Sequence, residues 1–200
     1  MVINGELGTI SSINAEMSNR HSDDYRNWLR NFNGGNMYIF GSHLVDLIVL
    51  LLGKPKRVLS NIGTSGLNDV DAPDLSSAML IYEHALARIF VSSVECNGWG
   101  RRCFSIAGSE GTVEIRPLEV PVRMSYAKLS DCTGGLNDFA KSVETEDLPN
   151  SERYDNMMKD FYSYILGEKQ NPFTYEHEYA VQEVLDEIIG GVKCNGTNIN

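Results

Sequence analysis

The sequence predicts a single α+β domain in which a largely antiparallel β-sheet is open on one face and covered by helices on the other. Three observations support this. Apolar residues recur at helical spacing through residues 37–52. Six strand-like segments follow at intervals of roughly ten residues, separated by short turns. Two further helical segments then close the chain.

The first elements are read from local patterns. Residues 7–18 alternate between apolar and small polar side chains, which predicts a half-buried strand. Residues 21–30 predict a short helix that begins at Ser22 or Asp23. The Asn- and Gly-rich residues 31–36 predict a loop, because both residue types tolerate left-handed backbone angles.

Residues 37–52 give the strongest helical pattern in the chain. Gly53 ends this helix and Pro55 prevents its continuation. So much apolar surface indicates a helix that is buried against a sheet. The apolar residues on three- and four-residue steps are Met37, Phe40, Leu44, Leu47, Ile48, Leu51 and Leu52.

The middle of the chain predicts an antiparallel meander. Its predicted strands are 56–66, 76–82, 85–95, 101–108, 111–117 and 120–128, with turns at 83–84, 97–100 and 108–111. Residues 129–150 predict a polar loop, including the acidic stretch 144–147. Two helices follow at 151–166 and 175–189, the second capped by Thr174. One domain spanning residues 1–200 accounts for all of these elements.

The composition excludes several function classes. The 200 residues include 17 Lys and Arg against 27 Asp and Glu, so the net charge is −10. An acidic surface disfavours nucleic acids and anionic membranes. No apolar run approaches the roughly 20 residues of a membrane helix, and the N-terminus has no secretory signal pattern. Four scattered cysteines without a C-x-x-C pair are typical of a reduced, cytoplasmic protein.

Several motifs are missing. The sequence has no dinucleotide-binding G-x-G-x-x-G, no P-loop and no G-x-S-x-G nucleophile elbow. The four histidines share no metal-ligand spacing, so no metal site is expected. They are His21, His43, His84 and His177.

His43 is the candidate for chemistry. It stands in the helix predicted over 37–52, with Asp46 three residues later and therefore on the same helix face. A carboxylate at that position can orient the imidazole and raise its basicity, as proton transfer requires. The alternative is a hydrogen-bonded core histidine with Asp46 in solvent.

Three further residues are candidates for substrate binding. Trp99 and Arg101, with neighbouring Arg102, lie at a predicted hairpin tip, where an indole and guanidinium groups suit sugar rings and hydroxyls. An exposed turn with balancing arginines explains them equally well. Tyr38 adjoins the histidine helix and could line a pocket, or could be a core aromatic. Both faces of the strand over 85–95 carry apolar residues, which predicts a homodimer or tetramer formed through the open sheet face.

Four segments resemble the C-terminal domain of the Gfo/Idh/MocA family (glucose-fructose oxidoreductase, inositol dehydrogenase and MocA). GGNMYIFGSHLVDLIVLLLGKPKRV resembles its opening helix, and INGELGTISSINAEMS resembles the strand before it. ALARIFVSSVECNGWGRRCFSIAGSEGTVEIRP resembles its central hairpins, and PFTYEHEYAVQEVLDEI its closing helix.

The resemblance implies a substrate-binding and oligomerisation domain of an NAD(P)-dependent oxidoreductase that acts on a sugar or polyol. Family members place a Rossmann domain for NAD or NADP before this domain, and a histidine at the position of His43 serves as acid/base. The chain begins where that Rossmann domain would end, so we expect no cofactor on this chain alone and no turnover without the missing domain.

One position departs from the family pattern. Many members carry an aspartate where this chain has Ile39, and an aliphatic side chain can neither orient an imidazole nor relay a proton. This departure and the absence of the family's usual catalytic lysine, which belongs to the Rossmann domain, support an alternative function, a non-catalytic binding or assembly module with the same fold.

Overall fold

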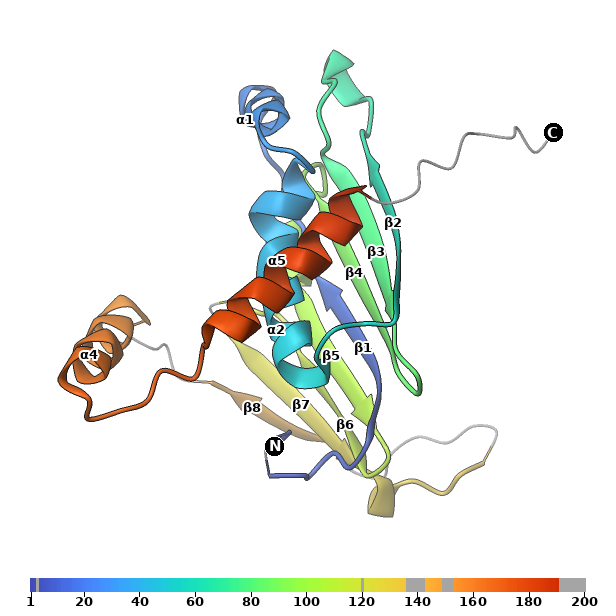
Figure 1. Cartoon of the computed structure of the whole chain (residues 1–200). Coiled ribbons are helices and arrows are strands. Elements are labelled where there is room, and N and C mark those ends of the chain that lie inside the picture. The colour runs from blue at the N-terminus through green and yellow to red at the C-terminus, as the bar shows by residue number, and fades with distance from the viewer. Residues whose placement is uncertain (3, 120, 136–142, 149–152, 191–200) are drawn as a thin grey trace.

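The chain forms an open sheet of eight strands with helices packed against it (Figure 1). The computed structural model describes residues 1–190 except 3, 120, 136–142 and 149–152. The strand order is β2-β3-β4-β1-β5-β6-β7-β8. The strands are β1 (Ile10–Glu16), β2 (Arg57–Gly63), β3 (Leu75–Ile81), β4 (Leu86–Ser92), β5 (Cys103–Gly108), β6 (Gly111–Ile115), β7 (Arg123–Lys128) and β8 (Glu144–Asp147). The predicted α+β class and open antiparallel sheet are confirmed.

The sheet is not a simple meander, which corrects one prediction. β1 lies between β4 and β5, parallel to β4 and antiparallel to β5, and every other neighbouring pair is antiparallel. β4 and β5 therefore do not form a hairpin. Of residues 97–100, predicted as its tip, 98–100 belong to a short helix, α3 (Gly98–Arg101), and Asn97 directly precedes it. This helix lies in the connection between β4 and β5, which are separated in the sheet by β1.

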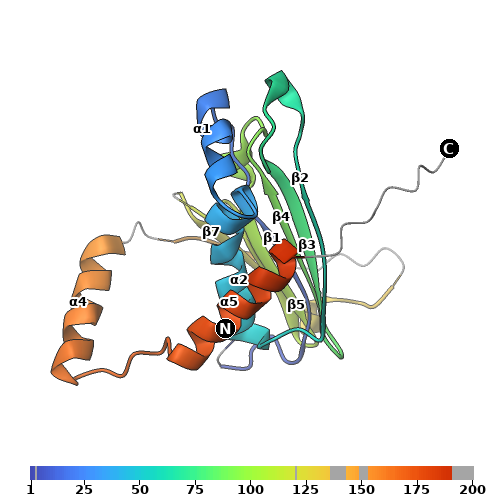
Figure 2. The same ribbon diagram turned by 45° about the horizontal axis from the view of Figure 1, so that its top comes forward.

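Two helices cover one face of the sheet (Figure 2). These are α2 (Ser42–Leu52) and α5 (Tyr175–Gly190), which pack on each other. α2 lies on the central strands β1 and β4, and α5 lies on the edge strand β2. α2 buries Leu44, Val45, Ile48 and Val49. Leu47, expected on the apolar face, is 37% exposed. The main core therefore lies between this helix pair and the sheet.

The predicted helix over 37–52 is two elements. Met37–Gly41 form a π-helical turn that leads into α2. The wider π turn shifts the side chains that precede α2 relative to an unbroken α-helix. A Cβ at Gly41 would lie 2.2 Å from the Met37 Sδ atom, so a larger residue at this junction would displace the buried Met37 side chain. The turn thus sets the directions in which Ile39 and Phe40 leave the helix start.

Asn36 fastens the preceding loop to the sheet. It is fully buried, and its side-chain amide donates to the Val91 carbonyl oxygen at 3.2 Å. Its Oδ1 atom accepts a hydrogen bond from the Ser76 hydroxyl at 2.7 Å. Gly35 has a φ of +52° and sits so close to Pro73 that a Cβ would lie 2.2 Å from the Pro73 carbonyl oxygen. The start of the histidine helix is therefore held at a fixed position over β3 and β4.

The remaining helices are shorter or peripheral. α1 (Asp23–Trp28) begins after Ser22, whose hydroxyl accepts a hydrogen bond from the Tyr25 amide, so the predicted Ser22 cap is confirmed. A 3₁₀ turn, Leu29–Asn31, follows α1. α4 (Arg153–Leu166) stands apart from the sheet in Figures 1 and 2. The Thr174 hydroxyl accepts from the His177 amide at 3.2 Å, which confirms the predicted cap of α5.

The segment predicted as a polar loop over 129–150 contains regular structure. Residues 144–147 form β8, an edge strand paired with β7, where an acidic loop was expected. Opposite charges explain the pairing, since Arg123 binds Asp147 at 2.7 Å and Lys128 binds Glu144 at 3.2 Å across the two strands. Residues 136–142 and 149–150 of that loop lie outside the described residues, as do Ser151, where α4 was expected to begin, and Cys194.

No described helix has both the length and the apolar character needed to cross a membrane. The three cysteines within the described residues, Cys96, Cys103 and Cys132, are free thiols.

Candidate functional site

An open cleft lies beside the N-terminal half of α2. Its volume is about 480 Å³, and its walls are formed by α2 with the π turn before it, α1, α3 and the segments that follow β1 and β6. Polar and aromatic groups are mixed in its lining, as in sites that bind polar organic molecules. The lining residues are Met17, Asn19, His21, Tyr25, Phe40, His43, Asp46, Leu47, Trp99, Arg102, Leu118 and Glu119.

His43 is an exposed residue on the wall of this cleft, in the first turn of α2. It makes no hydrogen bond or ion pair with another residue in the described part of the chain. The imidazole is thus accessible to a bound molecule rather than enclosed in the core. The alternative of a hydrogen-bonded core histidine does not apply to this residue.

Asp46 also lines the cleft, but its partner is not His43. Its Oδ1 atom lies 2.6 Å from Nε2 of His177, in the first turn of α5. The His177 side chain is 12% exposed and that of Asp46 is 39% exposed. The expected orienting contact between Asp46 and His43 is therefore replaced by a contact between two helices that pack side by side. The sequence separates these partners by 131 residues, so spacing alone could not reveal the pair.

A second imidazole, that of His21, belongs to the cleft and was not singled out from the sequence. Its ring stacks on Tyr25 with centroids 4.1 Å apart and on Phe40 at 5.3 Å. The Asn19 side-chain nitrogen lies 3.3 Å from its Nε2 atom. Burial, and then the positive charge of Arg102, lower the pKa of His21 below 6.5. The cleft therefore holds a neutral imidazole, fixed by two aromatic rings, near neutral pH.

α3 places Trp99 and Arg102 in the cleft and turns Arg101 away from it. Arg101 pairs with Glu95 at 2.5 Å and approaches Glu16 at 3.8 Å. The Arg102 guanidinium lies 4.1 Å from the centre of the Trp99 ring, binds Glu119, and donates through Nε to the Ser18 carbonyl oxygen at 3.1 Å. Of the two arginines, the buried Arg102 is the one positioned to meet a ligand.

Tyr38 and Ile39 do not line the cleft. Tyr38 is 40% exposed and its ring stacks on Phe32 at 6.2 Å. Ile39 packs against a small buried cluster of Leu29, Val70 and Ala72. The Ile39 side chain therefore takes part in hydrophobic packing and does not reach the cleft.

The cleft brings together several functional groups. These are the accessible imidazole of His43, the neutral imidazole of His21, the Asp46 carboxylate, the Trp99 indole and the Arg102–Glu119 ion pair. Such a set can bind hydroxyl groups and exchange a proton with one of them. Within the residues that the structure describes, no group of three or more His, Cys, Asp or Glu side chains could hold a metal ion.

Comparison with protein-family models decides the family. The model of the GFO/IDH/MocA C-terminal domain matches residues 1–114. The chain belongs to this family. No protein with a curated description matches the chain.

Solved structures of oxidoreductases share the fold of this Gfo/Idh/MocA domain. A putative NADPH-dependent oxidoreductase from Desulfitobacterium hafniense is 14% identical, with a TM-score of 0.74 over 95% of this chain and 56% of its own. A levoglucosan dehydrogenase, in complex with NADH and levoglucosan, is 16% identical, with a TM-score of 0.73 over 94% of this chain and 58% of its own. The putative oxidoreductase YvaA from Bacillus subtilis is 18% identical, with a TM-score of 0.68 over 94% and 57%. The chain thus spans somewhat more than half the length of these structures.

Proposed function

We propose that this domain binds the substrate of an NAD(P)-dependent oxidoreductase that acts on a sugar or polyol, and that it also forms the subunit interface. The observation that carries the proposal is the exposed His43 on the wall of the cleft. The polar and aromatic lining supports a sugar-like ligand, since flat aromatic faces and planar hydrogen-bonding groups suit sugar rings. The levoglucosan complex of a structure with the same fold supports this substrate class.

In this proposal His43 acts as the general base. It takes the proton from the substrate hydroxyl as the carbinol carbon gives up a hydride, which leaves a carbonyl group. Bound NAD or NADP supplies the acceptor for that hydride. Arg102, His21 and Asn19 orient the other hydroxyl groups, and Trp99 covers one face of the ring.

A second candidate function is a non-catalytic binding or assembly module. Ile39 favours it, because its side chain packs into a hydrophobic cluster and supplies neither a proton relay nor a hydrogen bond to His43. Both candidates use the same cleft, so they differ in what His43 does to a bound molecule. Substitution of a general base lowers kcat about 10² to 10⁴-fold, whereas in a binding module it changes affinity alone.

Subunit contact is proposed for the sheet face opposite α2 and α5, here called the outer sheet face. Side chains alternate between the two faces of a strand. Because Ala78 and Leu80 are buried, Met79 points to the outer sheet face. Leu59 pairs with Met79 across the strands, and the pair lines a shallow hollow of about 270 Å³. This apolar area is suited to contact with a second copy.

Ligand titration of the 200-residue chain tests the binding function. Levoglucosan, myo-inositol and glucose are added while NMR signals of the Trp99 indole and the histidine rings are followed. We expect one of these probes to shift the signals of Trp99, His21 and His43 together. His43→Ala should weaken that binding about tenfold, because a hydrogen bond to a hydroxyl group is lost. His84→Ala is the matched control, because His84 is 84% exposed at the turn between β3 and β4. Absence of shifts in the cleft with all three probes would contradict the proposal.

A further inference from the structure

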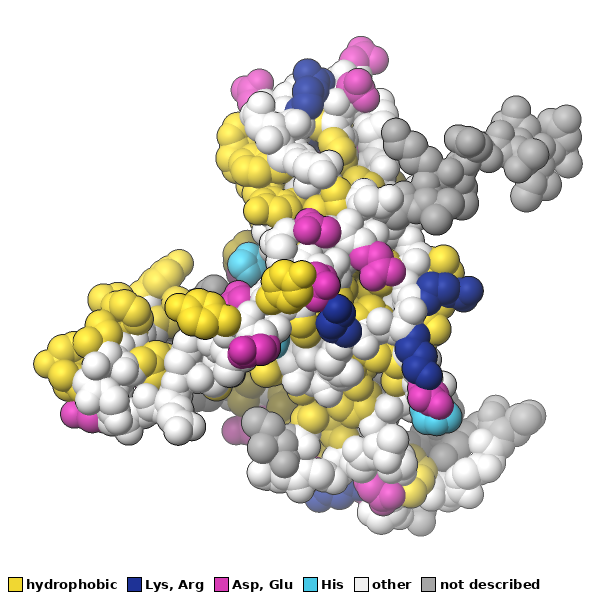
Figure 3. Space-filling view, in the orientation of Figure 1, with side chains coloured by type: hydrophobic (Ala, Val, Ile, Leu, Met, Phe, Trp, Pro, Cys, Tyr) yellow, Lys and Arg dark blue, Asp and Glu magenta, His cyan; other side chains and the backbone are white. Residues whose placement is uncertain are grey.

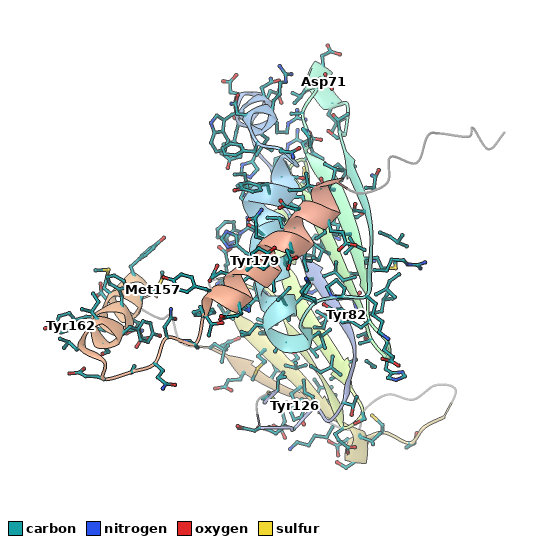
Figure 4. The ribbon with its side chains drawn as sticks, viewed as in Figure 1. Asp71, Tyr82, Tyr126, Met157, Tyr162 and Tyr179 are labelled. Atoms are coloured by element: carbon teal, nitrogen blue, oxygen red, sulfur yellow. The ribbon has the colours of Figure 1, made fainter. Side chains whose placement is uncertain are left out.

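A buried arginine attaches α1 to the rest of the domain. Arg26 lies in this six-residue helix, and its side chain is only 2% exposed. A helix this short is not stable alone, so its place depends on its contacts. Residues 64–74 join β2 to β3 and are here called the β2–β3 loop. Figure 3 shows acidic and basic side chains together at the end of the molecule formed by α1 and this loop, and Figure 4 shows Asp71 of the loop next to α1.

The guanidinium group of Arg26 is bound through both of its terminal nitrogens. Nη1 donates to Oδ2 of Asp74 at 2.8 Å, and the Asp74 side chain is fully buried. Nη2 donates to Oδ1 of Asp23 at 2.6 Å and to the Leu67 carbonyl oxygen at 3.0 Å. Because the group is planar, these bonds fix its orientation as well as its position. Arg26 therefore ties α1 to two points of the β2–β3 loop.

The Asp74 carboxylate depends on the same contact. Its other donors are the amide and the hydroxyl group of Ser65, at 2.6 Å and 2.8 Å. A buried carboxylate is costly unless donors and an opposite charge surround it. Removal of the guanidinium group would leave this carboxylate with two neutral donors. Arg26 and Asp74 thus act as one unit.

The backbone of Asp74 also supports the segment that carries His21. The Asp74 carbonyl oxygen accepts a hydrogen bond from the Ser93 amide at 2.8 Å, and the Ser93 carbonyl oxygen accepts one from the His21 amide at 3.0 Å. On the other side of the cleft wall, Tyr25 precedes Arg26 in α1 and stacks on the His21 ring with centroids 4.1 Å apart. Both stacked rings are therefore anchored at Asp74, one through Ser93 and the other through Arg26.

Apolar packing supports α1 but does not align it. A small cluster lies between α1, the β2–β3 loop and the π turn, and consists of Leu29, Val70 and Ala72 with Tyr25 and Ile39 packed against them. Hydrophobic contact is non-directional, whereas hydrogen bonds depend on distance and angle. The alignment of Tyr25 with His21 therefore depends on the directional bonds of Arg26.

We infer that Arg26 is a positioning residue of the cleft. Bound to Asp74, it keeps the Tyr25 ring stacked on His21 and so fixes where this imidazole meets a ligand. The Asn19 side-chain nitrogen lies 3.3 Å from Nε2 of His21, and Nδ1 has no hydrogen-bond partner in the described part of the chain. Nδ1 is therefore the ring atom available to a ligand hydroxyl. The inference rests on the proposed function only in naming that ligand as a sugar or polyol.

Three variants separate positioning from stability. Arg26→Met leaves the Asp74 carboxylate buried without its cation, so stability and alignment should both fall. Arg26→Met combined with Asp74→Leu replaces the pair by apolar side chains, an exchange that is often neutral or stabilising. Arg123→Met is the control, because Arg123 pairs with Asp147 on β7 and β8, strands that do not line the cleft. Urea unfolding measures the stability of each protein.

The positioning role is read from NMR signals of the His21 ring. A stacked aromatic ring shifts these signals upfield, so loss of the Tyr25 contact moves them downfield. We expect the downfield change in the double variant although its unfolding midpoint stays near that of the parent chain, and no change in Arg123→Met. The affinity for whichever of levoglucosan, myo-inositol or glucose binds the parent chain should fall about tenfold in the double variant, the effect of one misplaced hydrogen bond.

Unchanged His21 signals in a stable double variant would overturn the inference, because the buried pair would then serve stability alone. The same downfield change in Arg123→Met would also overturn it, since the signals would then report a general loosening of the fold. Equal sugar affinity in the parent chain and in a double variant with displaced His21 signals would contradict the role in ligand binding. If the signals move as expected and none of the three sugars binds the parent chain, Arg26 still positions the ring, and only the proposed substrate class fails.

Discussion

His21 shows how the cleft sets the chemistry of a single residue. Its ring is held between Tyr25 and Phe40, and burial together with Arg102 lowers its pKa below 6.5. In the unfolded chain the pKa returns to about 6.5. Between these two values the unfolded state binds more protons than the folded state. Folding stability attributable to His21 is therefore constant above pH 6.5 and falls as the pH drops through 6.5 toward the folded-state pKa.

This sign gives a measurable pH dependence. Urea unfolding of the parent chain between pH 7.5 and 5.5 should show a loss of stability to which His21 contributes at most about 1.4 kcal/mol per pH unit. His21→Gln cannot titrate, so its stability should fall less steeply over the same range. An NMR titration of the His21 ring gives the folded-state pKa directly. A value above 6.5, or identical slopes for the two proteins, would show that the cleft does not hold this imidazole neutral.

Single residues were predictable where the signal was local. The helix pattern placed His43 on α2, and Ser22 and Thr174 cap helices as their residue types suggest. The partner of Asp46 was not predictable, because His177 reaches it through the packing of α5 on α2. Arg101 and Arg102 are equivalent in the sequence. Their positions differ only in the structure, where the backbone of α3 directs Arg101 toward Glu95 and Arg102 toward Trp99.

At the scale of elements, two contacts that differ in burial join α5 to α2 and to the segment that follows α2. His177 and Asp46 meet at the edge of the cleft, where the His177 side chain is 12% exposed. Lys54 and Glu183 meet at 2.7 Å on the surface, with side chains 52% and 38% exposed. Solvent screens the second pair much more than the first.

Paired substitutions should reveal that difference. His177→Ala should lower the free energy of unfolding by about 1–2 kcal/mol, because it removes a hydrogen bond to a half-buried carboxylate. Lys54→Ala should cost less, and its effect should vanish in 1 M NaCl. Urea unfolding of both variants at low and high salt makes the comparison. If the two losses were equal and equally sensitive to salt, the contact at the cleft would have no special role in holding α5 against α2.

The positions of the strands and helices along the chain were predicted more accurately than their arrangement in space. Strand and helix positions were predictable because hydrophobic period and turn residues are local properties. The position of β1 between β4 and β5 could not be predicted. Parallel strands such as β1 and β4 are not joined by a short turn, so no turn residues in the sequence indicate that they pair. β8 was missed because three of its four residues are acidic. Its signal was complementarity to Arg123 and Lys128 on β7, which is visible only once the register is known.

At the scale of the whole molecule, the apolar surface is divided between two sides. The exposed apolar side chains of α4 lie apart from the sheet, while the outer sheet face is apolar at β2 and β3 and polar at β1 and β6. The register shows this gradient, since Leu59 and Met79 are followed across the sheet by Arg88, Asn14, Ser105 and Glu114. Self-association through the outer sheet face should therefore be centred on β2 and β3 and depend on salt, because two copies of net charge −10 repel each other at low ionic strength.

Sedimentation equilibrium at micromolar concentration tests this arrangement. We expect a mass of at least twice 22.3 kDa for the parent chain, with association that strengthens as NaCl is raised. Leu59→Asp should give a monomer, because it buries a charge against the apolar hollow of the second copy. Leu67→Asp is the matched control. Leu67 is 46% exposed and Leu59 is 47% exposed, but Leu67 lies in the loop beyond β2, away from the outer sheet face. A parent chain that is monomeric at every salt concentration would refute the sheet-face interface. A dimer that Leu59→Asp leaves intact would place self-association on another surface of the domain.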